Sequence, residues 1–461
     1  MTLPLHAARR TLAGAAGLAI SGLALSSCNV DAGTGLWLRD LDPVVLRGSA
    51  LPDLIGTDPG DIVAFRYDTP AGAWDQVPVQ VDERHLEHLA QLRNGTGSTG
   101  PMAMAYSDPA ANAGPDPVAT FDADDEVAFM ADDTGGEAPG GTARPAGVLA
   151  GSGVKVTVTD PLGPTSPLRG SGTGFVYLFE RSGGLAPGAG QDYVDYDFAP
   201  ADPMGHSESS TVSTDAYTTH FSSRWARDRL HLGGGPDLLD RHRNQFALDV
   251  CGRSEDTFSA GDGGYATNVD GPVRVIRSYL GANSGTYTQR EHVFYRGTER
   301  VQTFLRVHAI PGIMDFYDYS ASALGMRYRS SNVPGGVVID GIPDAMPAAA
   351  PTWEAVTGDH GALVSVSTVQ TDIVALGLQS YYSDDSTPAT TQCTGDAFEY
   401  GASGTRITTS IPNTDPSTTG TVYSFTGTRW NVYLGPGEPD STDLQVANIG
   451  APLSTSTGAW P

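Results

Sequence analysis

Arginine and histidine side chains gather in the stretch GTYTQREHVFYRGTERVQTFLRVH, residues 285–308. A guanidinium group binds a carboxylate or sulfate through two parallel hydrogen bonds, and an imidazole can remove a proton as a general base. Aromatic rings in the same stretch offer flat apolar surfaces on which a sugar ring can stack. These residue types together point to an acidic carbohydrate as ligand. The alternative is a solvated sheet face with scattered salt bridges.

Two strands and a short turn would position these side chains. The alternation predicts strands over 288–296 and 300–308, joined by a turn over 297–299. In the second strand one face is almost wholly apolar and should be core. The expected core residues are Val301, Thr303, Leu305 and Val307. The expected outer face carries Arg290, His292, Phe294, Arg296, Gln302, Phe304, Arg306 and His308.

The charge of this region differs from that of the rest of the chain. The whole sequence has 27 Lys and Arg against 53 Asp and Glu, a net charge of −26. That excess argues against nucleic acid or an anionic membrane surface as partner. Between residues 224 and 329, however, 14 arginines stand against 12 acidic residues. An anionic ligand would bind in such a window, unless its arginines pair with local acids.

The N-terminus has the pattern of an export signal. Arg9 and Arg10 precede an apolar run over 12–25, which is too short to span a bilayer, and the run ends at LSSC, with Cys28 last. This ending resembles the lipobox of bacterial lipoproteins. The resemblance implies cleavage after residue 27, lipidation of Cys28 and a tether over 28–35. It implies an exported, cell-envelope protein that contacts the membrane only through its lipid. The alternative is an ordinary secretory signal.

Two further cysteines, Cys251 and Cys393, remain in the mature chain. In an oxidising compartment they most simply form one disulfide. Two separate buried thiols are the alternative.

The rest of the chain is typical of an all-β protein. Short period-two segments recur between turn residues, which predicts a smaller N-terminal β domain over 36–185 and a larger antiparallel β-sandwich of supersandwich type over 190–461. The boundary falls in the Gly- and Pro-rich segment 181–193. Only 83–93 and 236–246 have the spacing or the opening proline of a helix.

Two segments contain candidate metal ligands. Asp122, Asp124 and Glu126 alternate before a strand and could bind calcium through their oxygens, although Val127 replaces the glycine of an EF-hand loop. Turn formation by aspartate is the alternative. His85 and His88 could ligate zinc, or could simply lie on the surface.

No nucleophile elbow, HExxH motif or P-loop occurs in the sequence. In composition and architecture the later domain resembles the β-sandwich polysaccharide lyases, in which a side chain or metal neutralises a uronate carboxylate and a Tyr or His removes the adjacent proton. The resemblance implies Asn283 or Arg290 as the neutralising group and Tyr287 or His292 as the base. Further ligand contacts are expected from Arg306, His308, Tyr317 and Arg327.

The leading hypothesis is therefore a surface-anchored lipoprotein that binds a carbohydrate and, in its lyase version, cleaves an anionic polysaccharide. The alternative is a non-catalytic envelope lipoprotein that binds a glycan or a protein.

Overall fold

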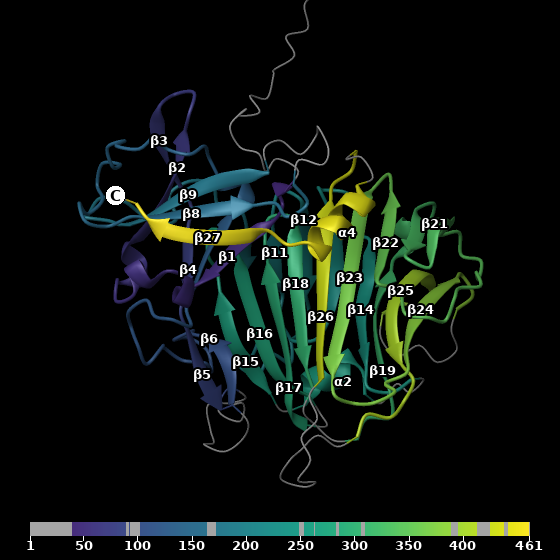
Figure 1. Cartoon of the computed structure of the whole chain (residues 1–461). Helices are drawn as coiled ribbons and strands as arrows, with labels where there is room; N and C mark the ends of the chain where they lie inside the picture. Colours follow the sequence, from purple (N-terminus) through teal and green to yellow (C-terminus); the bar gives the residue numbers. More distant parts are fainter. Residues whose placement is uncertain are drawn as a thin grey trace, which may run out of the picture. The chain divides into compact units, whose positions relative to one another are not determined.

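The alternation of apolar and polar side chains leads to β-strands, and these strands pair in antiparallel fashion. The structure, a computed structural model, describes residues 39–88, 92, 102–163, 172–248, 253–261, 263–282, 285–305, 309–388, 395–412, 425–437 and 441–460. Every pairing between strands in these ranges is antiparallel. The prediction of an all-β sandwich is confirmed (Figure 1).

One layer of the sandwich is a nine-stranded sheet. Its strands, in the order in which they pair, are β15 (Gly264–Val269), β16 (Val275–Ala282), β17 (Gly285–Phe294), β18 (Thr298–Phe304), β26 (Phe425–Leu434), β23 (Gly361–Thr371), β22 (Trp353–Gly358), β20 (Arg327–Ser330) and β21 (Val333–Val338).

The other layer consists of two four-stranded sheets. The first contains β10 (Asp195–Asp197), β11 (Ser210–Ser213), β12 (Tyr217–Phe221) and β13 (Arg227–Leu232). The second contains, in pairing order, β14 (Leu239–Gln245), β19 (Ile313–Tyr319), β25 (Glu399–Ile407) and β24 (Leu378–Asp385). Phe221 of β12 packs edge-on against Phe294 of β17, with ring centroids 6.2 Å apart, so the layers meet directly.

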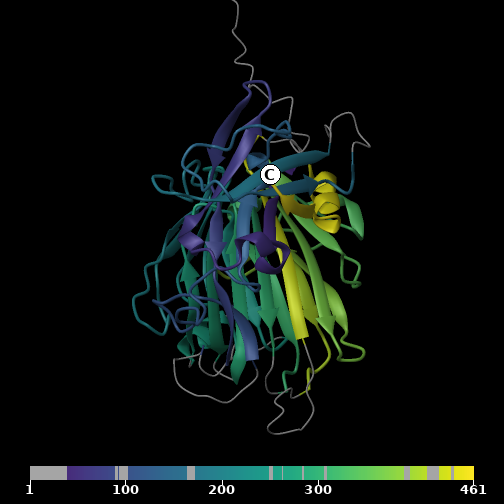
Figure 2. The same ribbon diagram turned by 60° about the vertical axis from the view of Figure 1, so that its left-hand side comes forward.

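Three smaller sheets come mainly from the first part of the chain. One pairs β1 (Pro43–Arg47), β7 (Glu126–Met130) and β4 (Gln80–Asp82). A second pairs β27 (Ser454–Ala459), β8 (Val154–Thr159), β9 (Thr173–Glu180), β2 (Ile62–Asp68) and β3 (Ala73–Val77). The third is the hairpin of β5 (Arg84–His88) and β6 (Met102–Tyr106). Figures 1 and 2 show this blue hairpin beside the teal strands of the nine-stranded sheet, where β6 contacts β15.

The described helices are short. They are the α-helices α2 (Glu255–Ala260) and α4 (Thr442–Gly450) and the 3-10 helices η2 (Gly48–Ala50), η3 (Pro52–Leu54), η4 (Pro59–Asp61), η5 (Ala131–Asp133) and η6 (Ala321–Ala323). In the described ranges no helix has the length and apolar character needed to cross a bilayer.

The C-terminal strand joins the sheet built by the early strands. β27, yellow in Figure 1, pairs with β8 from Ser454 opposite Thr159 to Ala459 opposite Val154. Trp460 then packs against Tyr177 at 4.9 Å between ring centroids. Residues 33–461 cluster as one compact unit. The division into residues 36–185 and 190–461 stays a prediction.

Both segments with helical patterning contain strands instead. Residues 84–88 form β5, which pairs with β6, and its Leu86 is 55% exposed rather than core. Residues 239–245 form β14, which pairs with β19. In β14 the side chains at alternate positions face another sheet, and this tertiary packing outweighs the weak helical spacing. The two helix predictions are therefore wrong over residues 84–88 and 239–245, whereas Leu92 is helical.

Candidate functional site

The predicted hairpin exists, but its register is shifted by three residues, because a turn over 297–299 would have placed residue 290 opposite residue 306. β17 ends at Phe294 and pairs with β18 so that Arg290 lies opposite Thr303 and His292 opposite Val301. The segment between β17 and β18 is therefore 295–297, and the innermost pair is Phe294 with Glu299, where residues 296 and 300 were expected to pair. Residues directly opposite each other in an antiparallel pair share a face, and a slip by an odd number of residues exchanges the two faces of a strand.

Arg290 and His292 therefore lie on the inner face of the sandwich, together with Val301. Their exposed fractions are 3% and 1%. The prediction that they stand on an open outer face is wrong. Tyr317 is also buried, in β19, so it too is part of the interior.

The other predicted ligand residues are not assembled into one site. Arg327 is exposed in β20, where its Nη1 donates to the carbonyl oxygens of Gly335 and Gly336, each at 3.2 Å. Tyr287 lies in β17, but its side chain is not among those that the structure describes. Outside the described residues lie Cys28, Cys251, Asn283, Arg306, His308 and Cys393. Their roles, including the disulfide, stay predictions.

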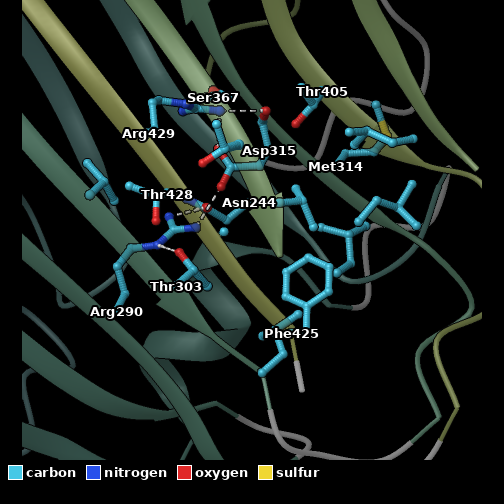
Figure 3. A pocket seen from close by; sticks show the side chains of 18 of the residues that line it. Asn244, Arg290, Thr303, Met314, Asp315, Ser367, Thr405, Phe425, Thr428 and Arg429 are labelled. Atoms are coloured by element: carbon cyan, nitrogen blue, oxygen red, sulfur yellow. Dashed lines mark hydrogen bonds and ion pairs between the residues drawn. The ribbon is translucent and has the colours of Figure 1, made fainter. Parts of the chain in front are cut away.

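A pocket lies between the two layers of the sandwich, beside Arg290 of β17 and Val301 of β18. It holds about 670 Å³ of open space, including solvent at its mouth. Strands β17, β18, β26 and β23 supply one wall, and β14, β19, β25 and β24 supply the other. Figure 3 shows the polar side chains gathered at one end. The apolar lining comes from Phe246, Val301, Leu305, Ile313, Val369, Leu378, Ile407 and Phe425.

The polar end is organised around the carboxylate of Asp315. Its Oδ1 lies 2.8 Å from Nη2 of Arg429 and 2.8 Å from Nε2 of His242, and its Oδ2 accepts from Nη2 of Arg290 at 2.6 Å. Burial opposes ionisation, but Arg429, Arg290 and His242 together hold the pKa of Asp315 well below its usual range. The side chain is still 23% exposed. Asp315 is therefore an ionised acceptor that a ligand can reach.

Both arginines around Asp315 are fixed in place. Arg290 donates through Nε to Oγ1 of Thr303 at 2.9 Å and through Nη1 to the side-chain oxygen of Asn244. Arg429 donates to the carbonyl oxygen of Asp315 at 3.0 Å and packs over the ring of Tyr317 at 5.0 Å. A preorganised set of donors and acceptors loses little conformational entropy when it binds a ligand.

No accessible general base is present among the described candidates. Burial lowers the pKa of His242 to about 3, so its imidazole is neutral and tied to Asp315. His292 is hydrogen-bonded on both nitrogens, to Glu299 at 2.8 Å and to the hydroxyl of Tyr279 at 3.0 Å. Burial raises the pKa of Tyr317. These groups hold the structure together, and none of them is free to take a proton from a substrate.

The two-carboxylate arrangement of glycosidases is also incomplete here. Asp315 is the only acidic side chain among the described residues that line the pocket.

One glycine leaves the middle of the pocket open. Gly427 of β26 lies between Thr303 of β18 and Val369 of β23 on the inner face. A Cβ atom added to Gly427 would meet only the ring of Phe425, at 3.8 Å. A larger residue would fit the backbone and fill the pocket.

The carboxylates expected to bind calcium do not converge. Glu126 faces Arg274, whose Nη2 lies 2.9 Å from its Oε2, while Asp122 accepts the N–H of Asp124 at 3.1 Å. This is the turn formation considered as the alternative. His85 binds Oγ of Ser107 at 2.9 Å. Within the described ranges, no group of three or more His, Cys, Asp or Glu side chains could hold a metal ion.

Sequence reasoning missed the residues that build this pocket. Asp315, Arg429, His242 and Asn244 come from three strands that are distant in sequence. One signal was available, because in GIMDFYDYS the alternation places Asp315 on the same face as Tyr317 and Tyr319. A carboxylate on a strand face that otherwise carries aromatic rings indicates a buried charge that is paired with another group.

Comparisons with known proteins add little. No family model matches the sequence, and no curated protein matches it. Among solved structures, a protein in the glycosyl hydrolase family 38 from Enterococcus faecalis is 8% identical, with a TM-score of 0.43 over 91% of this chain and 46% of that one. An alpha-mannosidase from Enterococcus faecalis V583 is also 8% identical, with a TM-score of 0.41 over 91% of this chain and 44% of that one. This chain spans less than half the length of either, and such TM-scores carry no argument about function.

Proposed function

We propose that the protein binds a carbohydrate in the pocket between the two layers of the sandwich. The observation that carries the proposal is the reachable, ionised carboxylate of Asp315 beside Arg290 and Arg429. Sugar hydroxyls both donate and accept, so they need acceptors and donors side by side. The apolar walls suit the carbon-bound faces of a sugar ring.

The charge of the polar end favours an acidic sugar. Arg290 and Arg429 contribute two positive charges, Asp315 contributes one negative charge, and His242 is neutral. The balance is one positive charge. We therefore propose a uronate-containing polysaccharide as the preferred ligand class, bound without cleavage.

Gly427→Leu tests the proposal. The leucine side chain should fill the pocket and weaken binding of its ligand at least about tenfold. Stability should change by less than about 1 kcal/mol, because Gly is a poor strand residue and the new Cβ meets open space. Isothermal titration calorimetry with a panel of neutral and uronate oligosaccharides gives the affinity, and urea unfolding gives the stability.

Gly458→Leu is the matched control. Gly458 also lies in a strand, is exposed, and has nothing within 4 Å of an added Cβ. The Gly458→Leu variant should bind the sugar as tightly as the parent protein does. The proposal fails if no sugar in the panel binds, or if the two leucine variants bind equally well.

We further propose that the chain is exported and anchored through lipid on Cys28. The support is the signal-like segment ending in LSSC. Cells that make the parent protein should incorporate labelled palmitate into it, and Cys28→Ser should lose the label and the membrane association. A Cys251→Ser variant serves as the control for loss of any cysteine. Labelling that persists in Cys28→Ser would contradict the anchor.

A further inference from the structure

The outer face of the β17–β18 hairpin lines a second cavity. Residues on this face are Gln289, Glu291, Arg300, Gln302 and Phe304, which alternate with the inner-face set. The cavity spans about 960 Å³, a volume that includes solvent at its mouth. Its opposite side comes from Arg47 of β1, Arg84 of β5 and the β6 residues Met102, Ala103 and Met104. It is separate from the pocket around Asp315, because the sheet itself lies between them.

Three guanidinium groups line this cavity in a chain whose net charge is −26. Arg84 is paired with Glu126, and Arg300 lies 3.2 Å from Glu291. Arg47 is exposed and makes no ion pair within the described part of the chain. Two of the three positive charges are therefore neutralised by carboxylates, and the third is left for a ligand.

The other residues that line the cavity indicate which further contacts a ligand would make. Gln302 offers an amide donor and acceptor, whereas Gln289 is buried and donates to Oγ of Ser278 at 3.1 Å. Phe304, Met102 and Met104 form an apolar wall. Past Arg300 and Glu126 the cavity adjoins a second hollow of about 1020 Å³ that Trp430, Tyr295 and Leu453 line. Both hollows share Glu126 and Arg300 in their walls. The ligand can therefore be longer than a single ring.

We infer that this cavity is a second ligand site, which binds an organic anion through Arg47. The anionic group is a carboxylate or a sulfate, because a guanidinium fork binds both in the same geometry. The body of the ligand lies against Phe304 and the two methionines. The site is independent of the carbohydrate pocket, since no residue lines both.

The test uses Gly427→Leu as the starting protein, so that the first pocket is filled. Glucuronate and glucose 6-sulfate are the anionic probes, and glucose is the neutral probe. Both anions should bind more tightly than glucose, and the stronger of the two identifies the anionic group. Adding Arg47→Glu should weaken anion binding at least about tenfold, as expected for loss of a charge-assisted contact.

Arg229→Glu is the matched control for charge reversal. Arg229 is exposed in β13 and makes no ion pair among the described residues. The Arg229→Glu variant should bind both anions as tightly as the starting protein does. Gln302→Trp, which fills the cavity without altering charge, should weaken binding of both anions. The inference is overturned if neither anion binds the starting protein, or if Arg47→Glu and Arg229→Glu behave alike. Because the first pocket is filled throughout, these results do not depend on whether that pocket binds a sugar.

Discussion

Glu299→Ala is expected to destabilise the protein by about 3–5 kcal/mol, the usual cost of removing one partner from a buried ion pair. Glu299 and Arg227 are both buried, with their charged atoms 2.8 Å apart. Glu299 also accepts from Nδ2 of Asn431 at 2.8 Å and from the hydroxyl of Tyr433. Alanine would leave the charge of Arg227 in the interior without a counter-charge. Urea unfolding at neutral pH measures the loss.

The matched control is an exposed ion pair. Glu137 is 58% exposed and lies 2.8 Å from Nζ of Lys155, so Glu137→Ala should cost less than about 1 kcal/mol. A double variant, Arg227→Met with Glu299→Leu, should lose clearly less than the sum of the two single variants, because no lone charge remains. If Glu299→Ala costs no more than Glu137→Ala, the buried pair does not support the sandwich.

The alternation of apolar and polar residues predicted most of the strands, because strand formation depends largely on local sequence. EVAFMAD became β7, with Val127 and Phe129 fully buried, and GALVSVSTV became part of β23. The hairpin was found for the same reason. The inner face of β18 was predicted correctly, with Val301 and Leu305 buried, but the faces of β17 were exchanged because its register against β18 differs by three residues from the expected one. Residue types near Gly297 do not determine that register on their own.

The polar interior could not be predicted from alternation. That reasoning assumes that each strand has one apolar and one solvated face, whereas Arg290 and Glu291 on the two faces of β17 are both buried. Their partners lie far away in sequence. Asp315 is 25 residues from Arg290, and Glu208 is 69 residues from Arg277, which it binds in the interior. Only the fold brings such charges together, so a window rich in arginine was misread as an exposed binding face.

This polar interior makes stability depend on pH through its two buried histidines. Burial lowers the pKa of His292 to about 4 and that of His242 to about 3. In the unfolded chain a histidine has a pKa of about 6.5, so the unfolded state takes up protons first as the pH falls. The stability that each neutral histidine contributes is therefore complete above pH 6.5 and is lost toward pH 4. Between pH 7 and pH 5 each should account for a loss of about 2 kcal/mol.

His292→Gln isolates this effect. Carboxyls such as Glu354, whose pKa burial raises to about 7, change stability in the opposite direction, so the total pH dependence of the protein mixes both. Glutamine can still bond to Glu299 but cannot titrate. The variant should therefore lose about 2 kcal/mol less than the parent protein between pH 7 and pH 5, measured by urea unfolding at both values. His206→Gln, at a site that is 45% exposed, is the control for replacing a histidine that the fold does not bury. Equal pH dependence in His292→Gln and the parent would mean that His292 is not held neutral in the folded protein.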